Sequence, residues 1–135
     1  MADLVASQTL LDGERLFVGK YTNFSDGTGE TNAVKVNVSA LAKSASGKAC
    51  TGVKINKILI STHGLEIRIF WDATTPLTAW VVPQNSMYQM DFSTFGGLTN
   101  NAGAGVTGNV TFTTSDQSAG DMYAVVLECI KTYAA

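Results

Sequence analysis

Apolar and polar residues alternate along most of this chain, and that alternation constrains the fold more than any other feature. Val34, Val36 and Val38 stand at every second position, with Lys35 and Asn37 between them. A strand places successive side chains on opposite faces, so the pattern predicts a half-buried strand. A similar period of two recurs in residues 15–24, 54–62, 65–71, 77–82, 87–92, 109–114 and 122–132.

The segments between these runs carry turn residues rather than helical patterns. Clusters of Gly, Asp, Asn, Ser and Pro separate the runs, and residues 39–52 form either a long loop or one short helical turn. Residues 54–62 and 65–71 make the best hairpin, and residues 122–132 are apolar on both faces, which predicts a central strand. We expect an all-β fold, a two-sheet β-sandwich of eight or nine short strands with possible jelly-roll connections.

The length of the chain predicts one domain. A chain of 135 residues is long enough to bury a core without a metal or a disulfide. Neither an internal repeat nor a linker is evident. Residues 1–11 precede the alternating pattern and are expected to form an N-terminal arm, with residues 12–135 as a single β-sandwich domain.

Charged residues are scarce. They make up 15% of the chain, against about 25% in a typical soluble domain. The surface is therefore finished largely with Thr, Ser, Asn and Gly, or is partly covered by another molecule. The net charge is −2, and the densest group of lysines, at positions 43, 48, 54 and 57, straddles a Ser/Gly loop. We expect no nucleic-acid partner, because non-specific binding rests on basic side chains that neutralise phosphates.

The N-terminal residues lack the basic and apolar regions of a secretory signal, and no apolar run approaches the roughly 18 residues of a membrane span. We therefore expect no membrane partner and synthesis in a cytosol. A reducing compartment favours Cys50 and Cys129 as free, buried thiols over a disulfide.

Residues 103–108 spell the G-x-G-x-x-G pattern of dinucleotide-binding proteins. That pattern binds a pyrophosphate when it follows a strand and opens a helix. Here it follows a loop and opens a strand, so we expect no cofactor.

His63 is the single histidine, so a catalytic triad would have to pass through it. Ser61, Asp72 or Cys50 could complete such a triad in space, but no nucleophile elbow supports one. We expect His63 to be a turn residue and the chain to have no catalytic residues.

Two further patterns in the sequence partly match known kinds of binding site. Asp26, Thr28 and Glu30 alternate in a Gly-rich turn and partly match a calcium loop, but the distal bidentate glutamate is missing. We expect a structural turn and no metal site. Trp71 and Trp80 are expected to pack in the core rather than form a sugar-binding platform with Tyr88.

Three stretches together resemble the small β-sandwich virion structural proteins of tailed bacteriophages, a group that includes capsid decoration (cement) proteins. They are FSDGTGETNAVKVNVSAL, KINKILISTHGLEIRIFWDAT and FGGLTNNAGAGVTGNVTFTT. The resemblance extends from about residue 12 to residue 132 and lies in the succession of strands and turns, not in a single diagnostic motif.

The resemblance implies a non-enzymatic protein that binds the major capsid protein on the outer capsid surface, commonly as a homotrimer, and stabilises the shell. The resemblance also implies that the protein is made in the host cytoplasm and lies on the virion. The arm and the loop of residues 93–108 are expected to contact neighbouring subunits, through Leu4, Val5, Leu10, Leu11, Phe95, Leu98, Asn100 and Asn101. The alternative is a carbohydrate- or receptor-binding sandwich of a phage tail or head fibre that uses Trp80, Tyr88 or nearby loops.

Overall fold

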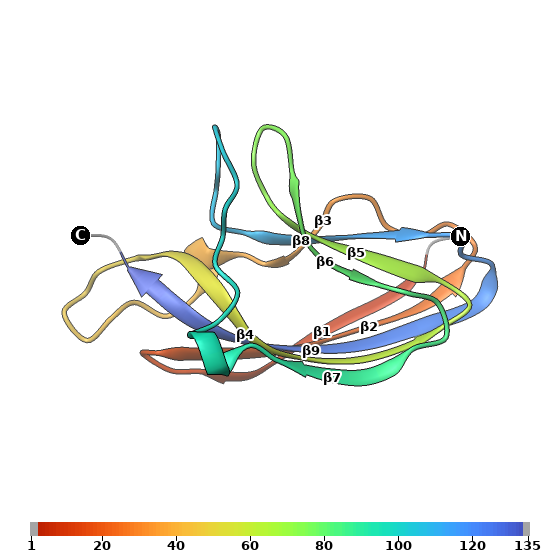
Figure 1. Ribbon diagram of the computed structural model, residues 1–135, viewed down its shortest axis with the longest axis horizontal. Coiled ribbons are helices and arrows are strands. Elements are labelled where there is room, and N and C mark those ends of the chain that lie inside the picture. Colours follow the sequence, from red (N-terminus) through yellow and green to blue (C-terminus); the bar gives the residue numbers. More distant parts are fainter. Residues whose placement is uncertain (1–2, 134–135) are drawn as a thin grey trace.

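Two antiparallel sheets stack face to face in the computed structural model, which describes residues 3–133 (Figure 1). The five-stranded sheet has the order β1-β2-β9-β4-β7, and the four-stranded sheet has the order β3-β8-β5-β6. The strands are β1 Leu4–Asp12, β2 Leu16–Asp26, β3 Ala33–Val36, β4 Cys50–His63, β5 Glu66–Trp71, β6 Leu77–Val82, β7 Met87–Asp91, β8 Val110–Ser115 and β9 Ala119–Tyr133. Two single-turn 3₁₀ helices, η1 Val38–Ala40 and η2 Ser93–Phe95, complete the described part. The expected two-sheet β-sandwich is confirmed.

The order of the strands from β2 onward is that of a jelly roll. Strands β2, β9, β4 and β7 lie in one sheet and β3, β8, β5 and β6 in the other, so the chain repeatedly crosses between the two layers. Strand β1 is an addition to this pattern and lengthens the first sheet beside β2. The described residues contain no helix long and apolar enough to cross a membrane.

The core lies between the sheets and is built from the inward rows of the alternating strands. Trp71, Phe112, Ile58 and Leu127 are among its fully buried side chains. Strand β9 occupies the middle of the five-stranded sheet, between β2 and β4, as its apolar sequence predicts. Burial of this continuous apolar surface is the main source of stability for such a sandwich.

The predicted hairpin between residues 54–62 and 65–71 is wrong. Strand β4 pairs with β9 and β7, whereas β5 pairs with β6 and β8 in the opposite sheet. Their inward rows, such as Ile60 and Ile67, therefore face each other across the core instead of lying side by side. Gly64, at a φ of +78°, turns the chain from one layer to the other. Alternation is the same for a hairpin and for such a crossing, so the sequence pattern does not separate them.

The alternation of Val34, Val36 and Val38 is also interrupted. Val36 and Val38 are buried, but Val34 is 51% exposed. A register shift between Val34 and Val36 in the pairing of β3 with β8 accounts for this, because a bulge breaks the period of two.

The N-terminal arm of residues 1–11 is not seen as an arm in the described residues. Residues from Leu4 onward belong to β1, which is paired with β2 along its length; Met1 and Ala2 lie outside the described residues. Both faces of β1 are exposed, so its sequence needs no alternation between polar and apolar positions. The backbone pairing that places it in the sheet leaves no trace in the pattern of side chains.

Candidate functional site: an uncharged sheet face

The outer face of the five-stranded sheet carries a surface without charged side chains near the start of β1. Leu4, Phe24, Met122 and His63 are register partners across β1, β2, β9 and β4, and the next row carries no Asp, Glu, Lys or Arg either. We call this surface the uncharged face because it has no Asp, Glu, Lys or Arg; it comprises Leu4, Ala6, Thr22, Phe24, Ser61, His63, Met87, Met122 and Ala124, of which His63 is the one ionisable residue. A shallow hollow of about 330 Å³ lies on it.

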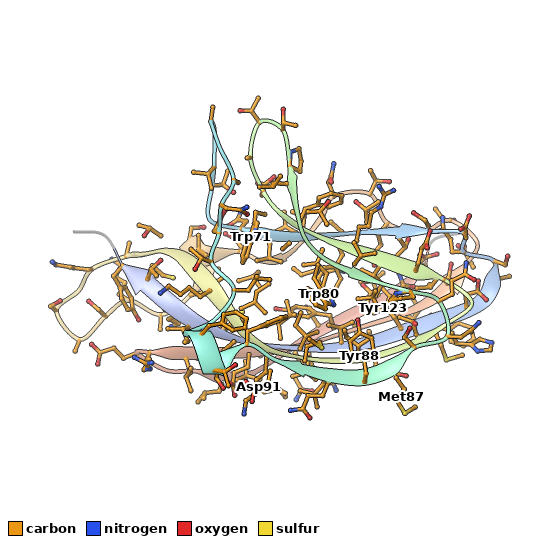
Figure 2. The ribbon with its side chains drawn as sticks, in the orientation of Figure 1. Trp71, Trp80, Met87, Tyr88, Asp91 and Tyr123 are labelled. Atoms are coloured by element: carbon orange, nitrogen blue, oxygen red, sulfur yellow. The ribbon has the colours of Figure 1, made fainter. Side chains whose placement is uncertain are left out.

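Large apolar side chains on this face project into solvent. Leu4 is 74% exposed, Phe24 is 52% exposed and Met87 is 84% exposed. Met87 points away from the opposite sheet, on the outer side of β7 (Figure 2). Exposed apolar patches of this kind mark interaction sites, since isolated apolar residues are common on surfaces but clustered ones are not.

The other half of the same outer face is charged. The rows that follow along the strands include Lys20, Lys57 and Glu128. The strands thus carry ordinary charged outward positions at one end and apolar ones at the other. The sequence analysis did not identify Phe24, Met87 and Met122 as surface residues. Their positions in the alternation place them on the outer face, but this can be recognised only once the face that packs on the core is known.

Four predicted interface residues, Leu4, Val5, Leu10 and Leu11, lie on β1 and are all exposed. Strand β1 is one edge of the five-stranded sheet. The four side chains belong to a surface that another molecule can reach, and only Leu4 also borders the hollow.

The other four predicted interface residues have different positions. Phe95 is 67% exposed on η2, and Asn101 is exposed. Leu98 instead pairs through its backbone with Ile55 (N–O distances of 2.7 and 3.0 Å) and packs against the core. The Asn100 side chain accepts a hydrogen bond from the backbone N–H of Ala102 at 2.9 Å, which fixes a local turn. The structure gives no support to the prediction that Leu98 and Asn100 contact neighbouring subunits.

The two predicted groups are not brought together. Leu98 lies beside β4, while β1 is separated from β4 by β2 and β9. From β1 through β2, β9 and β4 to Leu98 there are four steps between neighbouring strands, which correspond to roughly 19 Å. The β1 residues and the loop residues therefore belong to different surfaces.

The G-x-G-x-x-G segment has a structural explanation. It lies in a loop that stands beside the β5–β6 loop above the four-stranded sheet (Figure 1), with a hydrogen bond from the Thr74 N–H to the Ala104 carbonyl at 3.3 Å. A Cβ on Gly105 would come within 2.0 Å of Thr74 Oγ1, and one on Gly108 within 2.1 Å of the Thr51 carbonyl oxygen. The segment leads into β8 and not into a helix, so the phosphate-binding geometry is missing.

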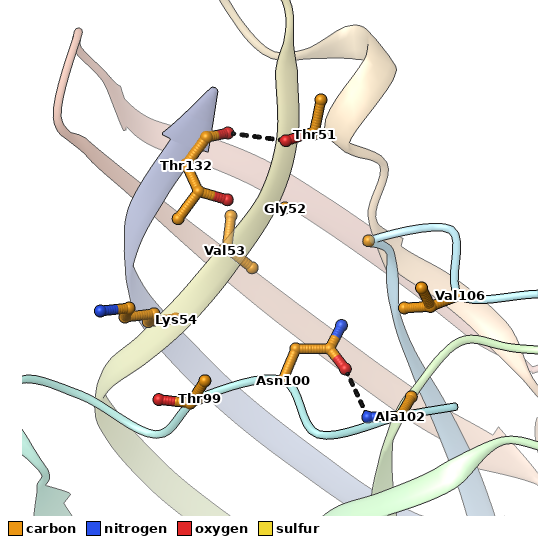
Figure 3. A pocket seen from close by; sticks show the side chains of 10 residues that line it. Thr51, Gly52, Val53, Lys54, Thr99, Asn100, Ala102, Val106 and Thr132 are labelled. Carbon is orange, nitrogen blue, oxygen red and sulfur yellow. Dashed lines mark hydrogen bonds between the residues drawn. The ribbon is translucent and has the colours of Figure 1, made fainter. Parts of the chain in front are cut away.

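A hollow of about 290 Å³ lies where this loop meets β4 (Figure 3). Thr51, Thr99, Asn100 and Thr132 contribute hydroxyl and amide groups, and Lys54 is its one charged lining residue. The Thr51 hydroxyl is already engaged, donating to the Thr132 carbonyl at 3.4 Å. The hollow contains no pair of groups suited to acid–base chemistry.

His63 has none of the partners that a triad requires among the described residues. It ends β4, whereas Cys50 begins the same strand, and thirteen residue steps separate them by roughly 40 Å. Asp72 follows the far end of β5, where its carboxylate accepts a hydrogen bond from the Thr107 hydroxyl at 2.8 Å. Ser61 shares the outer face with His63, but no hydrogen bond joins them.

The turn of residues 26–30 uses its acidic groups for structure. Asp26 Oδ1 accepts a hydrogen bond from the Thr28 N–H at 3.1 Å. The Glu30 carboxylate points inward, bonding Lys35 Nζ at 2.5 Å and the Tyr123 hydroxyl at 2.5 Å. The two carboxylates thus diverge, and within residues 3–133 no group of three or more His, Cys, Asp or Glu side chains is placed to hold a metal ion.

Asp3 joins the same end of the sandwich to β1. Its carboxylate accepts hydrogen bonds from Asn23 Nδ2 at 3.0 Å, from the Ser25 hydroxyl at 3.1 Å and from the Asp26 N–H at 3.1 Å. Partial burial acts to raise the pKa of Asp3, but these hydrogen bonds outweigh it and lower the pKa to about 2.

Replacing Asp3 with Asn is expected to lower the free energy of unfolding at neutral pH by about 1 kcal/mol, a value discounted for exposure. Because its pKa is lower in the folded state, Asp3 stabilises the fold above about pH 4, and this contribution is lost as the pH falls towards the folded pKa of about 2. Urea unfolding should therefore separate the two proteins at neutral pH and not near the folded pKa. Asp116→Asn, in an exposed turn, is the control, and an equal difference at both pH values would contradict the assignment.

The aromatic residues considered for sugar binding are engaged within the fold. Trp71 is buried, and the Trp80 indole N–H donates to the Tyr88 hydroxyl at 3.0 Å. Trp80 also packs edge-on against Phe92, with ring centroids 5.2 Å apart. Figure 2 shows Trp80 and Tyr88 turned towards each other between the sheets. Core packing of both tryptophans follows, as their sequence context predicts.

The two cysteines are free and buried, as predicted. Burial raises the pKa of the Cys129 thiol to about 12, and the neighbouring Glu128 adds to the effect. A thiol that stays protonated is a poor nucleophile.

No protein-family model matches the sequence, and no curated protein matches it. Hydroxypropylphosphonic acid epoxidase from S. wedmorenis aligns with a TM-score of 0.36 and 9% identity, over 91% of this chain and 49% of that one. A cobalt form of HppE bound to Tris buffer aligns with a TM-score of 0.37 and 9% identity, over 95% and 55%. A mutant of a family 29 carbohydrate-binding module aligns with a TM-score of 0.38 and 7% identity, over 96% and 79%. The chain spans about half the length of the two epoxidase chains, and none of these likenesses carries an inference about its function.

Proposed function

We propose that this chain is a non-enzymatic structural protein of a bacteriophage virion, most specifically a decoration protein that binds the capsid surface and stabilises the shell. The observation that carries the proposal is the uncharged face of the five-stranded sheet. The resemblance to virion sandwiches in strand and turn texture supports it, and jelly-roll domains are common in viral capsids. Fold-level similarity alone would not assign a function.

The chemistry of the uncharged face suits attachment to another protein. Interface cores are depleted in charged residues and enriched in aromatic residues and Met, which Phe24, Met87 and Met122 provide. Docking there removes apolar surface from water without removing a carboxylate, ammonium or guanidinium group from water. The major capsid protein is the proposed partner, and self-association, for which the resemblance implies a trimer, is proposed alongside.

Replacing Phe24 with Lys is expected to weaken binding to capsid shells by about tenfold or more, because it places an unpaired charge inside the contact. The measurement is co-sedimentation of the purified protein with shells that lack it. Val81→Lys is the matched control, since Phe24 and Val81 are both 52% exposed and Val81 lies on the opposite sheet. Equal binding by the two variants, or no binding by the wild type, would argue against the proposal.

The second candidate is a carbohydrate- or receptor-binding module. A hollow of about 410 Å³ between β6 and the segment that includes η2 favours it, because Phe95 lines this hollow together with Thr78, Thr99 and Asn101. An apolar ring next to hydroxyl and amide groups can contact a sugar. Glycan-array binding that Phe95→Ala weakens and Phe24→Lys leaves intact would favour this function over shell attachment.

A further inference from the structure

The four edge strands of the sandwich differ in how well they are protected against pairing with another chain. An edge strand presents unpaired backbone N–H and C=O groups, and proteins blunt such edges by short length, charge or proline. Strand β3 has four residues and carries Lys35, and β6 lies between Pro76 and Pro83. Strand β7 has five residues and ends in Asp91.

Strand β1 lacks these protections. It has nine residues, and the eight from Leu4 to Leu11 carry neither charge nor proline. Its one irregularity is a register shift between Thr9 and Leu11, which leaves the stretch from Leu4 to Thr9 regular. It is therefore the longest and least protected edge in residues 3–133.

Both faces of β1 expose apolar side chains, and this points to a strand as the occupant. Leu4 and Leu11 lie on the outer face, opposite Phe24 and Val18 of β2, whereas Val5 is opposite the buried Asn23 and lies on the inner face. A surface docking on one side would cover only one of these rows. An added strand supplies neighbours on both faces at once, because its own side chains alternate.

We propose that β1 pairs with β1 of a second copy of this chain, antiparallel and with a two-fold axis at Ser7. This register sets Ala6 opposite Gln8, Val5 opposite Thr9, and Leu4 opposite the bulge at Leu10 and Leu11. Reversing the strand thus matches leucine to leucine at both ends of the contact, while its middle pairs small and uncharged polar side chains, so no charged residue between Leu4 and Leu11 enters the contact. An isologous contact of this kind is self-complementary and closes after two subunits.

Two acidic side chains bound the strand, and one of them already has a cationic partner in its own subunit. Antiparallel packing brings Asp3 of one copy near Asp12 of the other. Asp12 is paired with the ammonium group of Lys131, which offsets its charge. Asp3 accepts hydrogen bonds from the neutral groups of Asn23 and Ser25 and keeps its negative charge, so one carboxylate faces an ion pair at each end of the contact. The edge of the uncharged face is also continuous with the contact, because the second copy's Leu11 would lie beside Leu4 at the margin of the hollow.

The mass of the full-length protein in solution tests the proposal. Light scattering after size exclusion, over a range of concentrations, should give twice the 14.2 kDa of the chain, and not the threefold mass of the trimer that the resemblance implies. Ser7→Lys places like charges opposite each other on the axis and should raise the dimer dissociation constant by about tenfold or more. Thr78→Lys, on the exposed β6 edge, is the matched control and should leave the mass unchanged. Circular dichroism verifies that both variants are folded.

A cysteine at the axis tests the register. Ser7→Cys should form a disulfide-linked dimer on mild oxidation, whereas Gln8→Cys and Thr78→Cys should form far less, because neither residue faces its own copy. A monomer at every concentration overturns the proposal, as does a dimer or trimer that Ser7→Lys leaves intact, or equal cross-linking by the three variants. The proposal does not rest on attachment to a shell, since these measurements contain no capsid.

Discussion

Glu30→Ala is expected to lower the free energy of unfolding by about 3–5 kcal/mol, the usual cost of removing one partner of a buried ion pair. The side chains of Lys35 and Glu30 are only 6% and 8% exposed, with 2.5 Å between Nζ and Oε2. The same carboxylate accepts hydrogen bonds from Asn23 Nδ2 at 2.8 Å and from the Tyr123 hydroxyl at 2.5 Å. Its removal leaves the buried ammonium group and two hydrogen-bond donors without a partner. Urea unfolding measures the resulting loss of stability.

Two comparisons separate the loss of the ion pair from a general effect of substitution. Glu66→Ala removes a carboxylate from β5 for which the described residues show no ion pair, so it should cost less than about 1 kcal/mol. The double variant Glu30→Gln with Lys35→Met should recover part of the stability, because no uncompensated charge remains buried. A loss below about 1 kcal/mol for Glu30→Ala would show that this pair is solvated in solution.

Burial raises the pKa of the Tyr123 hydroxyl above its ordinary value, and the hydrogen bond to Glu30 raises it further. The hydroxyl therefore stays protonated and donates to Glu30. Tyr123 on β9, Asn23 on β2 and Lys35 on β3 meet at this carboxylate. The polar cluster thus ties the two sheets together at the end of the sandwich where the uncharged face lies.

Gly108→Ala is expected to be the most damaging single-methyl change in the chain, costing more than about 4 kcal/mol or preventing folding. Gly108 has a φ of +88°, and a Cβ there would lie 2.1 Å from the Thr51 carbonyl oxygen and 3.2 Å from the Gly52 Cα. These are backbone atoms of β4, which cannot move aside without breaking the pairing of that strand. Chemical denaturation and the yield of soluble protein measure the effect.

Gly96→Ala provides the matched control. Gly96 has a φ of +83° and no heavy atom within 4 Å of its Cβ position, so it carries the backbone strain without the collision. That strain alone is expected to cost about 1–2 kcal/mol. Equal losses at the two positions would mean that the loop is not packed against β4 as described.

The residues predicted to make contacts have different positions in the structure, and part of the candidate surface was not predicted. The β1 residues and Phe95 are exposed, and their contacts with another molecule stay a prediction. The prediction failed to anticipate the structural roles of Leu98 and Asn100, because a single bridge to Ile55 and a local turn leave no distinct composition. Phe24, Met87 and Met122 were missed because an outward apolar residue in a strand reads as a core residue until the inward face is known.

The sequence by itself determined the fold class, most of the strands and the central place of β9. Side-chain alternation is a local property of each strand, so it is readable without knowing any neighbour. The tertiary structure alone decided which strands are neighbours. It separated β4 from β5, added β1 to a sheet edge and left one half of an outer face uncharged. Strand partners depend on long-range packing, and alternation specifies which residues share a face but not what that face meets.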